Sequence, residues 1–328
     1  MNIVLNTFGT SLNCDKGCFI IKTKDGVSRI PAEGVNSISL SKGSQITSDA
    51  VILAIENEID ILFNDRGGKP VGRVWSSRYG SISTIRKGQV NFAQSQEAVR
   101  WIKDTIRKKI ENQQAMIEMM EDVEVHQTHH KKKAVARLQE YIEKIESLEG
   151  GHISEIAQQI RGWEGVSSKI YFDALNIFID EKYRFEGRSQ RPALDVFNAL
   201  LNYGYGILYG KIEGALIKAG IDPYIGVLHR DEYNRPVLVY DIIELFRIWI
   251  DYIVFNIIRQ DVITDEFYSV RHDGSYWLEN LGRRVIIQAV NDYLEEHIKV
   301  GGLERSRLTH IQLYAQELAQ KFKKYEKK

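Results

Sequence analysis

The residues best suited to chemistry in this 328-residue chain are carboxylates and a histidine in its second half. Asp241 and Glu244 are three residues apart, so on a helix they share one face. The stretch that holds them, residues 241–258, is apolar nearly all round, which indicates a buried helix. A buried carboxylate is costly unless a cation or a metal ion pairs with it. The same spacing also fits a capping box, with Asp241 as N-cap, and that interpretation needs no metal.

His229 lies upstream of these two acids, after a segment punctuated by glycine and proline at positions 220–226. A second turn at residues 234–236 leads back toward the helix. This hairpin-like return can bring His229 beside Asp241 and Glu244. A lone histidine is more often a hydrogen-bonded structural residue than a metal ligand, so its acidic neighbours carry the hypothesis.

Glu164 is the third candidate acid, and Gly162 and Gly165 flank it before a further predicted helix. Because glycine has no side chain, a carboxylate between two glycines can approach a neighbouring helix closely. An exposed loop glutamate is the alternative. One imidazole and two carboxylates together suit Mg²⁺ or Mn²⁺, with positions left open for substrate oxygens.

The elements that must position these residues change in character along the chain. Up to about residue 90, short apolar runs alternate with turn signals, which predicts β-structure interrupted by one helix at Ser48–Asn57. Residues 92–149 contain no glycine or proline and show apolar residues at helical spacing, and the remainder is also mostly helical. We therefore expect an α+β protein with a small β domain at 1–90 and a larger all-α domain at 91–328.

Charge is balanced, with 44 basic and 44 acidic residues, so a nucleic-acid partner needs a local basic surface. Residues 66–109 provide one, with eleven basic and two acidic residues and interleaved aromatic rings. About half of these charges are expected to be ordinary solvated helix charges. The candidate DNA contacts are Arg66, Arg78, Arg86 and Lys87, and on the helical part Arg247, Arg259 and Arg283.

The chain shows no sign of export or membrane insertion. Cys14 and Cys18 are its only cysteines and form a poor zinc site, so we interpret them as reduced thiols. The N-terminus has no signal peptide, and the most apolar stretch, Ile242–Ile258, carries charged residues that exclude a membrane span. We expect a soluble cytoplasmic protein.

Four segments in order resemble a known family. They are RGWEGVSSKIYF, RSQRPALDVFNALLNYGYGILYG, AGIDPYIGVLH and NRPVLVYDIIELFR. Together they closely resemble the CRISPR-associated (Cas) endonuclease that integrates new spacers into a CRISPR array, with the strong match over roughly Arg161–Arg259. Ordered motifs over about a hundred residues are far more specific than any one of them.

The resemblance implies that Glu164, His229 and Glu244 bind the metal, with Asp241 as a nearby acid that either supports a ligand or is itself a further ligand. It implies an N-terminal β-sandwich used for dimerisation and a helical catalytic domain. It also implies a homodimer that works on double-stranded DNA with a small ferredoxin-like Cas partner. The reaction would be attack of a 3′-hydroxyl on a repeat phosphodiester, which needs no ATP because one phosphodiester replaces another.

Two other classes of function remain open from the sequence. A non-catalytic DNA-binding scaffold would use its acids only to cap a helix and would transfer no strand with any metal. A metal hydrolase for a small substrate is disfavoured because a small phosphate ester needs no long basic surface.

Overall fold

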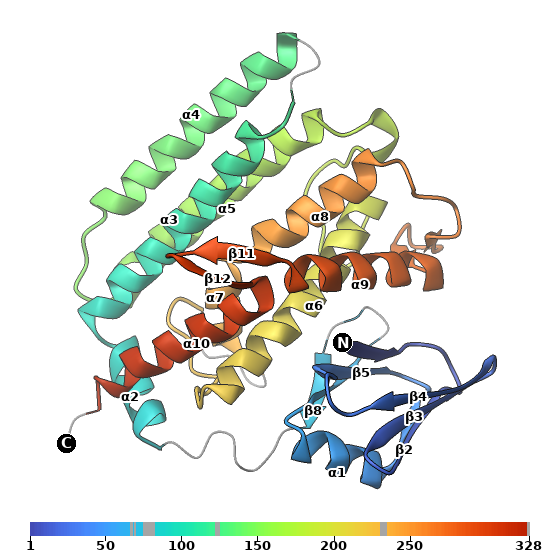
Figure 1. Cartoon of the computed structure of the whole chain (residues 1–328). Helices are drawn as coiled ribbons and strands as arrows, with labels where there is room; N and C mark the ends of the chain where they lie inside the picture. The colour runs from blue at the N-terminus through green and yellow to red at the C-terminus, as the bar shows by residue number, and fades with distance from the viewer. Residues whose placement is uncertain (66–67, 69, 75–82, 122–124, 230–234, 327–328) are drawn as a thin grey trace.

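The computed structural model of this chain describes residues 1–65, 68, 70–74, 83–121, 125–229 and 235–326. It is a mixed α+β fold, with strands near the N-terminus and long helices after them, as expected (Figure 1). Cys14 and Cys18 are free thiols.

Within the described residues, the N-terminal strands form two four-stranded sheets, ordered β1-β5-β7-β8 and β4-β3-β2-β6. Alternate side chains point inward, so Leu12 and Phe19 of one sheet share a buried core with Ile38 and Ile61 of the other. Helix α1 packs against β2 and β7. It starts at Ser48, as expected, and the Thr47 hydroxyl caps it by accepting a hydrogen bond from the Ala50 N–H. The elements are β1 (Asn2–Leu5), β2 (Ser11–Asp15), β3 (Cys18–Thr23), β4 (Gly26–Pro31), β5 (Ser37–Ser41), β6 (Gln45–Ile46), α1 (Ser48–Glu56), β7 (Asp60–Asn64) and β8 (Pro70–Val74).

The helices share a second and larger core. On α3, Ile102, Ile106 and Ile110 recur at four-residue spacing and are fully buried or nearly so, which is the pattern that predicted the helix. In Figure 1, α3, α4 and α5 run alongside one another, and each of the three packs against the other two. The helices are α2 (Ser83–Ala93), α3 (Gln96–Glu118), α4 (Val125–Ser147), α5 (Ile153–Ile177), α6 (Val196–Lys218), α7 (Val237–Ile243), α8 (Arg247–Arg259), α9 (Asn280–Glu295) and α10 (Arg307–Lys323).

The helical part is not all-α, which corrects the expectation from the sequence. Two short hairpins interrupt it, β9–β10 (Tyr268–Val270 and Tyr276–Leu278) and β11–β12 (His297–Val300 and Leu303–Ser306). Between the strands of the second hairpin, Gly301 and Gly302 make a tight turn, in which both residues have positive φ.

Two helices near the candidate acids differ from the sequence prediction. Helix α5 runs from Ile153 to Ile177, so Glu164 lies within a helix and not in a loop before one. The predicted helix from Asp241 is two helices, α7 and α8, separated by a tight turn at residues 244–246. In that turn the Leu245 and Phe246 N–H groups donate to carbonyls three residues back, and the Asn112 amide of α3 donates to the Leu245 carbonyl.

The β part meets the helical part through polar contacts around α6. Arg73 of β8 is almost fully buried and contacts the Gly210 carbonyl at 2.6 Å and the Glu213 carboxylate at 3.2 Å. The expected domain division at residue 90 falls inside α2, where Ile85 and Phe92 already belong to the helical core. The helical part therefore begins a few residues before that division.

Candidate metal centre

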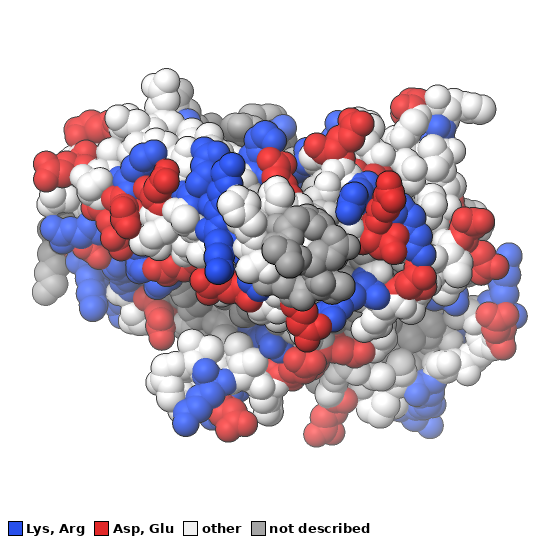
Figure 2. Space-filling model, turned by 90° about the horizontal axis from the view of Figure 1, so that it is seen from above, with Lys and Arg blue, Asp and Glu red and all other residues white. Residues whose placement is uncertain are grey.

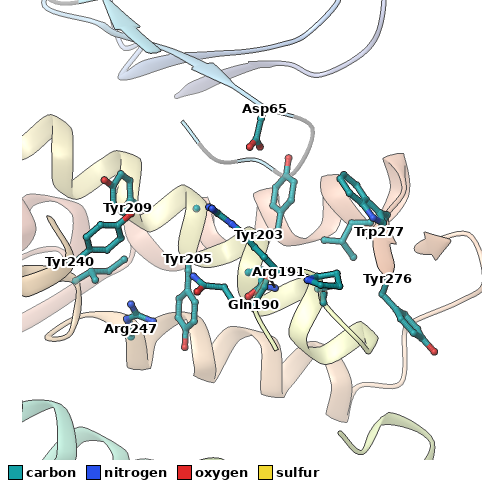
Figure 3. A pocket seen from close by; sticks show the side chains of 17 residues that line it. Asp65, Gln190, Arg191, Tyr203, Tyr205, Tyr209, Tyr240, Arg247, Tyr276 and Trp277 are labelled. Atoms are coloured by element: carbon teal, nitrogen blue, oxygen red, sulfur yellow. Dashed lines mark hydrogen bonds between the residues drawn. The ribbon is translucent and has the colours of Figure 1, made fainter. Parts of the chain in front are cut away.

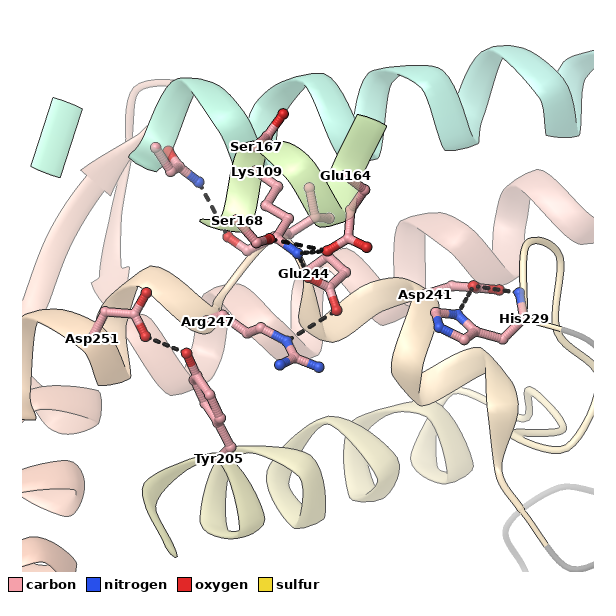
Figure 4. A network of polar contacts seen from close by, with 12 residues as sticks. Lys109, Glu164, Ser167, Ser168, Tyr205, His229, Asp241, Glu244, Arg247 and Asp251 are labelled. Atoms are coloured by element: carbon pink, nitrogen blue, oxygen red, sulfur yellow. Dashed lines mark hydrogen bonds and ion pairs between the residues drawn. The ribbon is translucent and has the colours of Figure 1, made fainter. Parts of the chain in front are cut away.

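Two of the candidate acids converge on one buried cation. Glu164 from the middle of α5 and Glu244 from the end of α7 both contact the ammonium of Lys109 on α3 (Figure 4). The Lys109 Nζ lies 2.5 Å from Glu244 Oε2 and also contacts Glu164 Oε1. Two carboxylates therefore face one point from different helices, which is the arrangement that a cation site requires.

Charged neighbours keep this cluster ionised. Burial opposes the charged form of Glu244, but Arg247 and Lys109 outweigh it and hold its pKa below the usual range. The Arg247 Nε lies 3.0 Å from Glu244 Oε1. Burial also opposes the charge of Lys109, yet Glu244 and Glu164 more than compensate and raise its pKa. Ser168, one turn along α5, donates to Glu164 Oε1 at 3.3 Å.

His229 and Asp241 form a second unit beside these acids (Figure 4). The His229 Nδ1 lies 2.7 Å from Asp241 Oδ1, so the expected approach of the histidine to this acid is found. Since a carboxylate only accepts, Nδ1 donates this hydrogen bond, and Nε2 is the ring nitrogen left to face a metal ion. His229 is close enough to Glu244 to help lower its pKa.

Asp241 does not cap a helix, which corrects one of the two interpretations of its spacing. Helix α7 already begins at Val237, and its N-cap, Pro236, has no side chain able to accept a hydrogen bond. The buried Asp241 carboxylate instead accepts the backbone N–H groups of residues 227, 228 and 229, at 2.7, 3.2 and 3.0 Å. Its role in the structure is to fix the loop that carries His229.

Other side chains support the same loop. Arg161, three residues before Glu164 on α5, donates to the Leu228 carbonyl at 2.7 Å. The buried Gln89 amide of α2 donates to the carbonyls of Asp222 and Ile225. A Cβ at Gly226 would lie 2.6 Å from the His229 carbonyl oxygen, so the loop requires glycine there.

The glycines beside Glu164 have no such role, contrary to the expectation. A Cβ at Gly162 or Gly165 would meet no atom within 4 Å. The close approach of Glu164 to its neighbours comes from the packing of α5 against α3, and not from missing side chains.

The proposed ligands are two carboxylates and an imidazole, which are residue types that bind divalent ions, although their side chains are not gathered into one cluster. The Lys109 ammonium stands in for a cation between Glu164 and Glu244, and His229 is oriented by Asp241 as metal-binding histidines commonly are. Over the part of the chain that the structure describes, no three His, Cys, Asp or Glu side chains converge closely enough to form a metal site. The set Glu164, His229 and Glu244 stays a prediction.

The cavity beside the carboxylates continues toward a buried acid that was not predicted. It has a volume of about 200 Å³ and reaches Arg188, Tyr205 and Asp251. The Tyr205 hydroxyl donates a hydrogen bond to Asp251, and the guanidinium carbons of Arg188 and Arg247 lie 5.4 and 4.9 Å from the centroid of its ring. Burial raises the pKa of the Asp251 carboxyl to about 6. Hydrogen bonds from tyrosine side chains and the positive charges of the nearby arginines act in the opposite direction.

A larger pocket of about 610 Å³ lies on the other side of Tyr205 and Arg247, which line both spaces (Figure 3). Its wall is rich in aromatic and polar side chains and includes Arg191. Flat rings with a few hydrogen-bonding groups suit an unpaired nucleobase. The rings are those of Tyr203, Tyr205, Tyr209, Tyr240, Tyr276 and Trp277.

The predicted DNA contacts of the N-terminal half are only partly described. Arg66 and Arg78 lie outside the described residues. Arg86 and Lys87 are exposed on α2 and stay candidates. The face shown in Figure 2 mixes basic and acidic side chains and carries no single basic field.

The three arginines of the helical half occupy different settings. Arg247 belongs to the carboxylate cluster. Arg259 is exposed and pairs with Glu121 at 2.6 Å, and Arg283 donates to Asn280 at 2.8 Å. Arg247 is engaged in the carboxylate cluster, while Arg259 and Arg283 are on α8 and α9 and Arg86 and Lys87 are on α2, so the two sets remain separate predictions.

Lys109 is the main site residue that sequence reasoning missed, because it was counted among the basic residues of a possible DNA surface. It lies instead on the inner face of α3, between Ile106 and Gln113, and its side chain is 8% exposed. The available signal was its position, since a lysine on the apolar face of a helix needs a buried partner.

Comparison with known proteins identifies the family. The sequence profile described as CRISPR associated protein Cas1 matches residues 3–292, and the chain belongs to this family. The CRISPR-associated endonuclease Cas1 1 of Archaeoglobus fulgidus is 28% identical over 330 residues, covering 97% of this chain and 95% of the relative.

Two solved structures share the fold. A casposase bound to an integration product has a TM-score of 0.83 at 19% identity, covering 100% of this chain and 92% of its own. A chain of a Cas6-RT-Cas1--Cas2 complex has a TM-score of 0.80 at 22% identity, and the match covers 98% of this chain and 35% of that longer one. Among the described residues, no helix has both the length and the apolar character to span a bilayer.

Proposed function

We propose that this Cas1 family member is a metal-dependent DNA endonuclease and integrase that inserts short DNA fragments into a CRISPR array. Glu164, His229 and Glu244 would hold Mg²⁺ or Mn²⁺. The observation that carries the proposal is that Glu164 and Glu244 converge on one cation position. Beside them, the Nδ1 atom of His229 is hydrogen-bonded to a carboxylate, so that Nε2 would be the ligand.

Asp241 would act through His229 and not on the ion directly. By accepting the hydrogen bond from Nδ1, Asp241 would orient the ring so that Nε2 is presented as the ligand. Its three backbone hydrogen bonds make that orientation rigid, because the loop and the acid cannot move independently.

The chemistry is phosphodiester transesterification. A 3′-hydroxyl oxygen of the incoming fragment forms a new bond to a repeat phosphorus, the existing P–O bond breaks, and the proton lost by the attacking hydroxyl ends on the released 3′-hydroxyl. The bound ion would supply Lewis-acid stabilisation of the phosphate charge. Arg247 adds fixed positive charge beside the same cavity, and the aromatic pocket across Tyr205 would hold an unpaired base near the reacting end.

The proposed partners are double-stranded DNA, a small ferredoxin-like Cas protein and a second copy of this chain. The A. fulgidus relative is named an endonuclease, and the structural neighbours include a casposase on an integration product and an assembly with Cas2 in its title. Exposed apolar side chains on the β part, Phe8, Val27 and Val71, are the features that favour dimerisation through this part.

The test is strand transfer into supercoiled DNA that carries a CRISPR repeat, with and without Mn²⁺. Wild-type protein should transfer strands only with the metal, and Glu164→Ala, His229→Ala and Glu244→Ala should each abolish transfer at matched thermal stability. Wild-type rates in two of these variants would overturn the proposal.

The second candidate is a non-catalytic DNA-binding scaffold. One observation favours it, because Lys109 and Arg247 already neutralise the carboxylates without a metal. This scaffold would bind DNA with normal affinity and transfer no strand in any divalent metal, so the same assay separates the two functions.

A further inference from the structure

The cavity at the carboxylates is electrically balanced. Its lining carries three acids (Glu164, Glu244, Asp251) and three cations (Lys109, Arg188, Arg247) around about 200 Å³. Sites that bind divalent ions strongly on their own present an excess of negative charge, because affinity follows the number of charged ligands. This cavity has no such excess.

Lys109 competes for the same oxygen atoms that an ion would use. Its Nζ contacts Glu164 Oε1 and lies 2.5 Å from Glu244 Oε2, while Arg247 holds the other oxygen of Glu244 at 3.0 Å. The Lys109 side chain is only 8% exposed, so its ammonium has no easy route to water. An ion that entered alone would leave this ammonium buried beside a second positive charge, which is strongly unfavourable.

We infer that Lys109 makes loading of the divalent ion depend on bound DNA. The inference rests on the proposed function, since it assumes that Glu164 and Glu244 are metal ligands. A DNA phosphate that enters the cavity supplies the missing negative charge. It pairs with the displaced ammonium of Lys109 while the carboxylates turn to the ion, so ion and phosphate enter together.

Thermodynamic linkage gives this inference a second consequence. If DNA tightens metal binding by some factor, the metal tightens DNA binding by the same factor. Lys109 is then a positioning residue that restricts a charged reaction centre to the DNA-bound protein.

The experiment measures Mn²⁺ affinity by the electron paramagnetic resonance signal of free Mn²⁺, with and without a short duplex whose 3′ ends lack the hydroxyl. Wild-type protein should bind Mn²⁺ about tenfold or more tightly with the duplex present, within the usual range of such couplings. Lys109→Gln should bind Mn²⁺ more tightly than wild type in the absence of DNA, and the effect of DNA should shrink.

The matched control is Lys108→Gln, because Lys108 is the adjacent lysine but faces outward and pairs with Asp104 at 2.9 Å. It should behave as wild type. Equal Mn²⁺ affinity of the wild-type protein with and without DNA overturns the inference, even if Lys109→Gln fails to fold. A folded Lys109→Gln that matches wild type in both conditions also overturns it.

Glu244→Ala separates this failure from failure of the proposed function. If Glu244→Ala still binds Mn²⁺ as wild type does, the ion lies elsewhere and the ligand set itself is wrong. If Glu244→Ala loses the ion while Lys109→Gln leaves the effect of DNA unchanged, the ligand set stands and only the role of Lys109 is rejected.

Discussion

The buried Asp241 carboxylate ties the loop that carries His229 to α7, since it accepts three backbone N–H groups and the hydrogen bond from His229 Nδ1. Its spacing to Glu244 fits both a helix cap and a functional acid, and only the true start of α7 at Val237 separates the two. Valine is a weak helix former, so the sequence favoured a later start at Asp241. The contact with His229 was predictable because the turn signals of the sequence on both sides of His229 indicate that the chain returns toward Asp241.

Replacing Asp241 with asparagine tests its role as the anchor of the His229 loop. The amide nitrogen cannot accept, so backbone N–H groups lose a partner, at a cost of about 1–3 kcal/mol in the free energy of unfolding. The loss of charge behind His229 should also weaken Mn²⁺ binding by about 10- to 100-fold. Urea unfolding and Mn²⁺ titration measure the two effects. Asp173→Asn, at an exposed position on α5, is the control, and equal results for both variants would refute the anchoring role.

At the scale of elements, the helices were largely predictable and their junctions were not. The apolar spacing of α3 predicts that helix directly, because its buried face follows the helical period. The break between α7 and α8 has no proline or glycine to mark it, and at this point Asn112 of α3 donates a hydrogen bond to the Leu245 carbonyl. Tertiary contacts of this kind cannot be read from a local pattern.

Two glycine substitutions test how the elements hold the site. Gly226→Ala places a Cβ 2.6 Å from the His229 carbonyl, so strand transfer and thermal stability should both fall. Gly165→Ala meets no atom within 4 Å, although Gly165 adjoins Glu164. It should keep activity and stabilise α5 by about 0.5–1 kcal/mol. Melting curves and strand-transfer rates of the two variants decide this, and a tolerated Gly226→Ala would show that the loop is not held as described.

At the scale of the whole molecule, the β part rests on α6 through a polar interface that includes Lys211. Its ammonium donates to Ser37 Oγ at 3.0 Å and to Asn2 Oδ1 at 3.3 Å. Burial lowers its pKa to about 8, with Asp60 and Glu295 acting in the opposite direction. No local pattern predicts this contact, since residues 2, 37 and 211 are distant along the chain.

The lowered pKa of Lys211 predicts a dependence of stability on pH. From about pH 8 up to the ordinary lysine range near pH 10, the unfolded chain holds this proton more firmly than the folded chain. The contribution of Lys211 to stability therefore rises with pH in that window. Urea unfolding of wild type and Lys211→Met at pH 7 and pH 9 should show wild type gaining relative to the variant at the higher pH. A constant or opposite difference would contradict the assignment.

The DNA path is also a property of the whole molecule, and Arg86 and Lys87 on α2 are the exposed candidates for it. Replacing both with glutamine should weaken binding to unrelated duplexes alike, because phosphate contacts carry no sequence information. Each lost contact should flatten the slope of log affinity against log salt by about one unit. Lys132→Gln with Lys133→Gln removes the same charge from α4 and is the control. An unchanged slope in the α2 variant would place the DNA elsewhere.

The central claim is that Glu164, His229 and Glu244 hold one divalent ion. Anomalous diffraction at the manganese edge, from crystals of the protein grown with Mn²⁺ and a duplex lacking 3′-hydroxyl groups, tests it most directly. We expect a single strong peak bound by both carboxylates and by Nε2 of His229, with Nδ1 still hydrogen-bonded to Asp241. A peak bound by other residues, or none at saturating Mn²⁺ with the Lys109 contacts unchanged, would contradict it.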